Sequence, residues 1–481
     1  MFSDGSTELT GNFWAQNTST GMHYRVDAEL LAKGMFCNVW VEKSSYVNWH
    51  TAETVAYVYD NDIHEKMLET FGMNVDLLGY DGKSINTLNT IQFADWLANG
   101  DKGDGKINIL LLDIKDNYWP GVNESYVAGY FWAGNFFDNV RYSNKSSMIY
   151  IDTNPGVPGT DKSNATIAHE MQHLMNFVTR EIKSGTTGTP RRAMDIWIDE
   201  GLSSAAEREY NGEHSLDRIG WYNNNGDVKG DIKGLIEQGN NFFVWGNHVT
   251  NNNPYPILDD YATVYLFFQW LRLQSNMGAA IYYDIITSEN YDYNAVTSAA
   301  NKYIPGNGFN NWETLLKTWF AANYINNTAG IYGYKNDLNI ITHWAPANKS
   351  ISLYPGEGVY SKTNSQPTIT GQGINIRNAY LNKTPAQVND STFYTGGALL
   401  TYNVNTTKTT YSDGSQGGIP EIGTTTGAAN VDIVPAGRFL QTPLSGPFAI
   451  SAGDMLRLKG HEDGLKDLDL PKFGNGIIIN E

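Results

Sequence analysis

The chain has 481 residues, which is too long for one compact core, so we expect several domains. Its 51 Asp and Glu outnumber its 33 Lys and Arg, which gives a formal net charge of −18. Such a negative surface argues against nucleic acid and anionic membranes as partners. The aromatic content of 13% is high for a disordered chain and indicates folded domains.

Targeting signals and cysteines narrow the class of protein further. Cys37 is the single cysteine, so no disulfide can form within the chain, and we expect a buried structural thiol. No apolar run reaches the eighteen residues that suggest a membrane span. Residues 1–10 lack the charged and apolar regions of a signal peptide, so we expect any leader to be missing. The composition resembles exported bacterial proteins, which predicts a secreted or cell-surface protein, and we expect a monomer.

The first third of the chain alternates between strand and helix patterns. Residues 1–22 are polar and are expected to form an extended arm. Tyr24–Lys43 contains two apolar stretches that predict a pair of strands. Ala52–Phe71 has apolar residues at helical spacing, and Gly72 is a plausible end for that helix.

A glycine–aspartate turn, Asn99–Lys106, precedes the apolar strand Ile107–Ile114. Its acidic groups could bind calcium, but their spacing does not match the EF-hand loop. A tight turn before a buried strand is the favoured interpretation, and Ca²⁺ is kept as a second candidate ion.

Two further strands lead to a helix over Ala165–Phe177. Tyr126–Phe137 is aromatic and punctuated by glycines, and Met148–Asp152 is a short apolar strand. This order predicts a mixed sheet with the helix packed beneath it. We take Tyr126–Phe137 as the candidate edge strand, which could hold an extended peptide by main-chain hydrogen bonds.

The remainder of the chain divides into a helical block and a β region. A second helix is expected over Ile196–Tyr210, a long loop or lid over Asn223–Asn253, and a strongly apolar helix over Leu258–Leu273. Further helical segments reach about Asn326. From about Asn348, short alternating runs separated by turns predict an all-β sandwich.

These patterns predict an α+β protein in three parts. Residues 1–160 would form the N-terminal α/β part of the catalytic domain. Residues 161–347 would hold the active-site helix, the glutamate helix and a helical subdomain. Residues 348–481 would form the C-terminal β-sandwich.

The main chemical signal is the motif HExxH within Ala165–Phe177. His169 and His173 are four residues apart, so a helix places both imidazoles on one face, where they can reach a single ion. Glu170 lies beside that face, where its carboxylate could take a proton from a metal-bound water. The alternative, an ordinary amphipathic helix, does not explain two histidines and a glutamate on an otherwise mostly apolar helix.

A catalytic zinc site needs a third protein ligand. Thr179 stands where a metzincin would have its third histidine. The best candidate is Glu200 on the second helix, with Asp195, Asp199, Glu207 and Glu209 as alternatives from the same region. Asp199 should point away from the ion because it is adjacent to Glu200. Glu207, two turns along the same face, is better placed as an acceptor for an imidazole N–H.

Three stretches, MIYIDTNP, AHEMQHLMNF and WIDEGLSSAAE, together resemble the hyicolysin family of bacterial extracellular neutral metalloproteases, in the gluzincin branch of zinc peptidases. The resemblance covers roughly residues 104–273. It implies a zincin-like core in which His169, His173 and Glu200 hold Zn²⁺ and Glu170 is the base. Thermolysin-like gluzincins carry Ser-Asp after the ligand glutamate, whereas Ser203 and Ser204 stand here. Glu207 or Ser204 is therefore expected to orient the first histidine.

The resemblance implies a secreted zinc endopeptidase acting on protein or peptide substrates. Tyr261, at the start of an apolar helix, resembles the tyrosine that stabilises the oxyanion in aminopeptidase-type gluzincins; a purely structural buried tyrosine is the alternative. His248 is a weaker candidate. Two other functions stay open: an aminopeptidase of the same clan, and a non-catalytic adhesion protein that retains the fold. No GxMEN motif for a substrate amine is present, and Glu170 is not needed for zinc binding alone, so both are less favoured.

Overall fold

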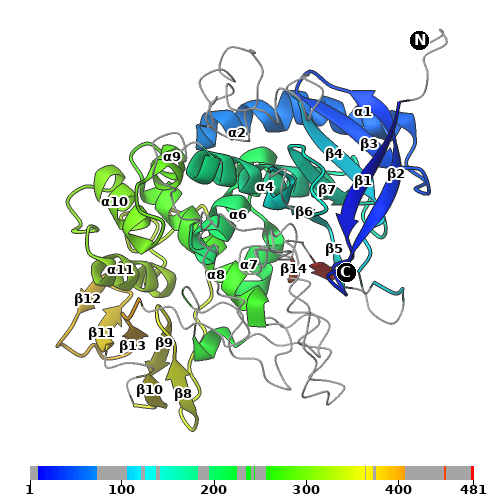
Figure 1. Ribbon diagram of the computed structural model, residues 1–481. Coiled ribbons are helices and arrows are strands. Elements are labelled where there is room, and N and C mark those ends of the chain that lie inside the picture. Colours follow the sequence, from blue (N-terminus) through cyan, green and yellow to red (C-terminus); the bar gives the residue numbers. More distant parts are fainter. Residues whose placement is uncertain are drawn as a thin grey trace, which may run out of the picture.

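The computed structural model has an α+β fold, as predicted, with a mixed sheet, several helices and a C-terminal antiparallel sheet region (Figure 1). It describes residues 9–72, 106–116, 118–120, 125–136, 141–182, 194–224, 235–239, 243, 256–362, 364–371, 375–406, 449–450 and 478–480. The calcium candidate Asn99–Lys106, apart from Lys106, and most of the predicted loop Asn223–Asn253 lie outside these residues.

The central sheet has six strands in the order β1-β2-β3-β4-β7-β6. Their bounds are β1 Thr10–Gln16, β2 His23–Lys33, β3 Cys37–Glu42, β4 Ile107–Leu112, β7 Met148–Asp152 and β6 Gly129–Phe131. Strands β3, β4 and β7 run parallel, and β6 pairs antiparallel with β7. All residues of β4 and β7 are buried, which explains their continuous apolar sequences.

Two expectations about the sheet are tested directly. Among the described strands, β6 is the outermost on its side of the sheet, which agrees with the predicted edge within Tyr126–Phe137. The prediction of an extended arm over residues 1–22 was wrong in one respect, because Thr10–Gln16 within it forms strand β1, which pairs antiparallel with β2. Aromatic packing explains this pairing: the ring of Phe13 lies 5.0 Å from that of Trp40 in β3, and Ala15 is buried.

The strand just before β6 and two strands near the C-terminus form a second, smaller sheet. Strand β5, Ser125–Val127, pairs antiparallel with β15, Ile478–Asn480, which pairs in turn with β14, Ala449–Ile450. A short 3₁₀ helix, η4 Ala133–Phe136, follows β6.

The predicted helix over Ala52–Phe71 is present but contains one wider turn. It consists of α1 Trp49–Val58, the π-helical turn η1 Tyr59–Ile63 and α2 His64–Phe71. Asn48 caps its start by accepting from the backbone N–H of Thr51, and Gly72 ends it with φ 62°. Helix α1 packs on β2 and β3.

The HExxH segment lies in α4, Asp161–Phe177, which continues into a π-helical turn, η5 Val178–Ile182. Thr160 caps α4 by accepting from the N–H of Ser163 at 3.3 Å. Helix α4 packs against β6, β7 and α2 and, above all, against α6, Ile196–Asn211. Because it is enclosed on these sides, every residue of α4 from Ser163 to Phe177 is buried.

The remaining helices form a block around α8, Pro256–Gln274. They are α7 Leu216–Asn223, η6 Ile236–Gln238, α9 Ala280–Thr287, α10 Tyr293–Tyr303 and α11 Trp312–Ile325. Tyr261 to Leu271 of α8 are all buried, so this helix is apolar on every side because other elements surround it. Among the described helices, none has the length and apolar character needed to cross a membrane.

The C-terminal β region packs on α11 through β11 and β13 (Figure 1). It holds an antiparallel sheet in the order β12-β11-β13-β9 and a parallel pair, β10-β8. The bounds are β8 Ser350–Leu353, β9 Gly358–Lys362, β10 Thr368–Gly371, β11 Ile376–Asn382, β12 Gln387–Asn389 and β13 Ala398–Asn403. Most of the predicted sandwich beyond residue 406 lies outside the described residues.

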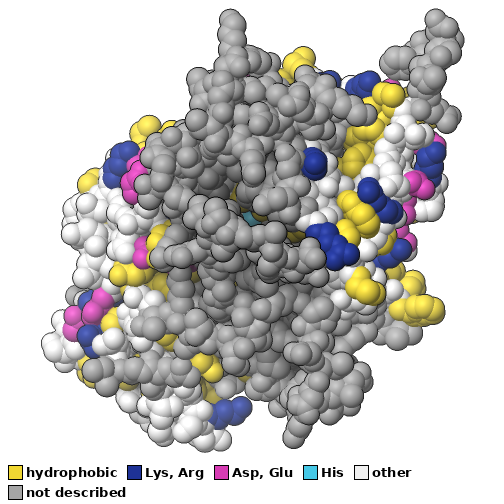
Figure 2. Space-filling view, in the orientation of Figure 1, with side chains coloured by type: hydrophobic (Ala, Val, Ile, Leu, Met, Phe, Trp, Pro, Cys, Tyr) yellow, Lys and Arg dark blue, Asp and Glu magenta, His cyan; other side chains and the backbone are white. Residues whose placement is uncertain are grey.

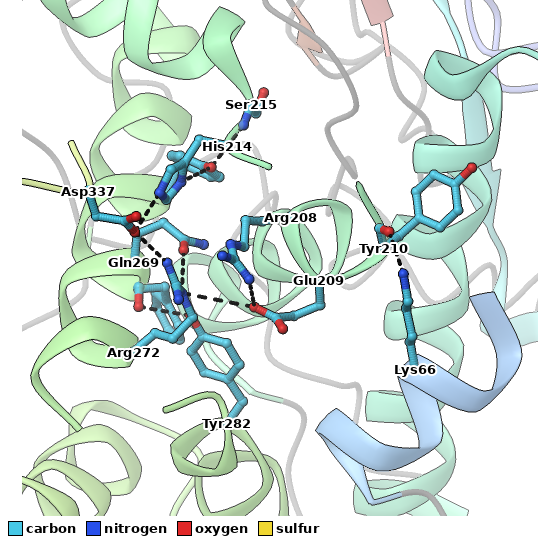
Figure 3. Close-up of polar contacts among 12 residues, drawn as sticks. Lys66, Arg208, Glu209, Tyr210, His214, Ser215, Gln269, Arg272, Tyr282 and Asp337 are labelled. Carbon is cyan, nitrogen blue, oxygen red and sulfur yellow. Dashed lines mark hydrogen bonds and ion pairs between the residues drawn. The ribbon is translucent and has the colours of Figure 1, made fainter. Parts of the chain in front are cut away.

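A polar network fastens the turn between α6 and α7 to the helical block (Figure 3). His214 lies 2.9 Å from the hydroxyl of Tyr265 in α8 and 2.8 Å from Asp337. Arg272 of α8 donates to the same carboxylate of Asp337 at 2.8 Å. These contacts hold the end of α6 in place.

Close packing of α6 on α8 depends on Gly201. A Cβ at this position would lie 2.3 Å from a ring carbon of Phe268, which is fully buried. We expect Gly201→Ala to lower the free energy of unfolding by about 1–3 kcal/mol, because the added methyl forces buried groups apart. Denaturant unfolding would measure the change.

The matched control is Gly220→Ala in α7, where a Cβ would meet nothing within 4 Å. This change should be neutral or stabilise the protein by up to about 1 kcal/mol, because alanine favours helix. Equal stabilities for the two variants would contradict the packing role of Gly201.

Candidate metal centre

Helix α4 presents its two histidines side by side. The ring centroids of His169 and His173 are 5.0 Å apart, as expected for positions i and i+4. Their exposed fractions are 0% and 2%, so both imidazoles are removed from solvent. Figure 2 shows a small area of histidine near the middle of the face that it draws.

Helix α6 brings Glu200 to the same point. Oε2 of Glu200 lies 3.5 Å from Nε2 of His169 and 3.6 Å from Nε2 of His173. One ligand atom from each of the three residues lies within 4.8 Å of the others. These three form the candidate metal cluster among the described residues.

The dimensions of this cluster suit a zinc ion. Zinc binds histidine nitrogen and carboxylate oxygen at about 2.0–2.2 Å, so neighbouring ligands of a tetrahedral site are roughly 3.3–3.5 Å apart. The two measured separations are close to this value. Nε2 of His173 and both carboxylate oxygens of Glu200 also have no hydrogen-bond partner among the described residues, although all are buried. A cation would satisfy all three atoms.

His169 is oriented by Glu207, as anticipated. Its Nδ1 lies 2.7 Å from Oε1 of Glu207, seven residues beyond Glu200 on α6. An ionised carboxylate only accepts, so Nδ1 carries the proton and the lone pair of Nε2 faces the cluster. Ser204, the alternative partner, makes no hydrogen bond through its hydroxyl to any described residue.

His173 is oriented by Asp199. Its Nδ1 lies 3.0 Å from Oδ2 of Asp199, whose other oxygen accepts from the side-chain amide of Asn176. The hydroxyl of Ser203 lies 3.1 Å from the same Nδ1. Asp199 does point away from the candidate ion, as its position beside Glu200 predicts. Its contact with His173, however, was not anticipated from the sequence.

The cluster is rich in buried carboxyl groups. Burial raises the pKa of Glu200 to about 8, and it raises that of Glu170 well above the usual value. Burial alone would lower the pKa of His173, but Asp199 and Glu200 outweigh it and raise that pKa well above 6.5. Burial thus makes the ionised carboxylates costly by themselves, and a bound divalent cation would offset that cost.

Glu170 lies between the cluster and the edge strand. It is completely buried, and the backbone N–H of Phe131 in β6 is close enough to lower its pKa in part. The charge of His173 lowers the pKa of Glu170, and the charges of Glu200 and Glu207 raise it. The carboxylate is thus beside the candidate ion and beside the strand that could hold a peptide.

Among the described residues, the other site residues that the sequence suggested do not belong to the cluster of His169, His173 and Glu200. Tyr261 is fully buried on α8, with its ring 5.4 Å from the guanidinium carbon of Arg218. Asp195 is the N-cap residue of α6, and Glu209 pairs with Arg208 (Figure 3). His248 lies outside the described residues.

Sequence reasoning missed Arg218, a buried residue of α7 that is 2% exposed. Its Nη2 donates to Oε1 of Glu207 at 2.8 Å, the same oxygen that contacts His169. No motif marks an arginine in this position, because it reaches the site only through the packing of α7 on α8.

A mixed sheet whose edge strand lies against a helix with HExxH, with a second helix that adds a glutamate, defines a zincin-like fold. The chain is 30% identical to the neutral metalloprotease ShpI of Staphylococcus hyicus over 300 residues. This similarity confirms the predicted resemblance to the hyicolysin family of metalloproteases. The matched stretch is 61% of this chain and spans 58% of the length of that relative. No family model matches the chain.

Removing Glu200 tests the third position of the cluster. Glu200→Ala should reduce zinc affinity by more than the roughly 10–100-fold that is typical for loss of an outer contact to a ligand. Competition with a chromophoric chelator would measure the affinity. Glu209→Ala, on the same helix but paired with Arg208, should bind zinc like the unchanged protein. Full affinity in Glu200→Ala would exclude the glutamate as a ligand.

Proposed function

We propose that this protein is a zinc-dependent endopeptidase in which His169, His173 and Glu200 hold the ion. The observation that carries the proposal is the convergence of three buried donor groups at zinc-like separations. Similarity to a relative named as a neutral metalloprotease supports the same class of activity. We further propose that the protein acts outside the cell, because its composition resembles that of exported proteins.

Zinc bound at this point would polarise a peptide carbonyl and make a water molecule more acidic. In the proposed mechanism, Glu170 accepts a proton from the attacking water and then delivers it to the nitrogen of the leaving amine. Burial raises its pKa, which makes its carboxylate a stronger proton acceptor. Glu207 and Asp199 keep the two imidazoles oriented throughout.

The substrate would lie along β6. An outer strand has backbone N–H and C=O groups directed away from its one neighbour, so an extended peptide can pair with it. The short distance from β6 to α4 supports this arrangement. At Gly129 of β6, a Cβ would lie 2.8 Å from Thr166 of α4, so glycine allows this close approach. Main-chain pairing of this kind does not require a free substrate terminus, which favours internal cleavage over aminopeptidase activity.

Glu170→Gln tests the proposed base without changing the size of the side chain. Zinc content should be unchanged, because Glu170 is not among the proposed ligands. Casein cleavage should fall by on the order of 10²–10⁴-fold, because the amide cannot accept the proton.

Mass spectrometry of the products of the unchanged protein separates the competing functions. Internal fragments support an endopeptidase, and stepwise loss of N-terminal residues supports an aminopeptidase. If the unchanged protein and Glu170→Gln both bind zinc and neither cleaves any substrate, the protease proposal fails and a binding role remains.

Tyr261 is proposed as the second donor to the oxyanion, beside zinc. This proposal rests on the resemblance to aminopeptidase-type gluzincins; in the structure, Tyr261 lies on α8 next to Arg218, which contacts Glu207. Tyr261→Phe should lower kcat by on the order of 10²–10³-fold and leave zinc affinity unchanged.

The control for this prediction is Tyr265→Phe, one turn further along α8. The hydroxyl of Tyr265 is engaged with His214 and the N–H of Ser215, so this change should reduce stability rather than kcat. An unchanged kcat in Tyr261→Phe would leave the tyrosine with a packing role only.

A further inference from the structure

Arg218 stands out among the buried groups near the cluster, because nothing in the proposed mechanism uses it. It is 2% exposed, and a buried guanidinium is costly unless a partner offsets the lost hydration. Its partner is Oε1 of Glu207, at 2.8 Å from Nη2. Its other face lies over the ring of Tyr261, 5.4 Å from the ring centroid.

A single oxygen of Glu207 thus makes two contacts. His169 approaches it through Nδ1 at 2.7 Å, and Arg218 approaches it through Nη2 at 2.8 Å. A carboxylate oxygen has two lone pairs, so both donors can be accepted at once. With Arg218 in place, the carboxylate has little freedom to rotate away from the imidazole.

The need for such a contact follows from the length of the side chain. Glu207 is 3% exposed in its side chain, and glutamate has more rotatable bonds than aspartate. Asp199, the shorter acceptor for His173, has its second oxygen held by Asn176 of α4 itself. Each orienting carboxylate is therefore held by a further donor, an amide for Asp199 and a guanidinium for Glu207.

We propose that Arg218 is a positioning residue for the metal centre, which fixes Glu207 and thereby the orientation of His169. This inference rests on the proposed function only in that the cluster binds a metal ion. Two effects of removing Arg218 have opposite signs. Loss of its positive charge alone would strengthen cation binding, whereas loss of its hold on Glu207 would weaken it.

The experiment compares Arg218→Gln, Arg218→Lys and the control Arg208→Gln. Arg208 lies in the last turn of α6, next to Glu207 in the sequence, but pairs with Glu209 in the network of Figure 3. Zinc affinity is measured by chelator competition, and the visible absorption of the Co²⁺-loaded protein reports the ligand geometry. Circular dichroism confirms that each variant is folded.

Arg218→Gln should bind zinc 10–100-fold more weakly and alter the Co²⁺ absorption. Arg218→Lys should fall between Arg218→Gln and the unchanged protein, because lysine keeps the charge but not the planar fork. Arg208→Gln should match the unchanged protein. If Arg218→Gln does not fold, reduced zinc affinity in folded Arg218→Lys carries the same conclusion.

Unchanged or tighter zinc binding in the Arg218 variants, with an unaltered Co²⁺ spectrum, would overturn the positioning role. Proteolysis is a separate measurement. If the unchanged protein binds zinc but cleaves nothing, the proposed function fails while the role of Arg218 stands. If it binds no zinc, both fail.

Discussion

The structure depends on the burial of two imidazoles between α4 and α6, each held by a carboxylate from α6. Such a group of ionisable side chains is expensive to remove from water, and it persists only when every member has a partner. His169 has Glu207, His173 has Asp199, and the acceptors have Arg218 and Asn176 in turn. Among the described residues, Nε2 of His173 and the carboxylate of Glu200 are left without a hydrogen-bond partner, and a divalent cation can meet both.

Helix packing sets the distances within this group. Helix α6 carries a proposed ligand and both orienting carboxylates, so a small displacement of this one helix would disturb the whole cluster. Gly201 lets α6 approach α8 closely, directly beside Glu200, and Gly129 does the same between β6 and α4. At the far end of α6, His214 and Asp337 hold the following turn (Figure 3). Gly201, which directly follows Glu200, thus serves the packing of α6 on α8.

Helix α4, which carries the two histidines, packs against α6 and also against the edge strand β6. Glu170 lies on the buried side of α4, close to the backbone of Phe131 in β6. A proton acceptor, a group of donor atoms and an unshared strand edge therefore occur together. None of these features is unusual alone, and it is their combination that favours peptide-bond hydrolysis as the chemistry.

The sequence by itself determined the parts that depend on local periodicity. Spacing along a helix placed His169 and His173 on one face, and the same rule put Glu207 on the face of Glu200. Continuous apolar runs, which are also local features of the sequence, located β4, β7 and α8. The tertiary structure decided what depends on contacts between distant segments: the pairing of β1, the contact from Asp199 to His173, and the arrival of Arg218 from α7. No local pattern encodes these, because each results from how whole helices and strands pack together.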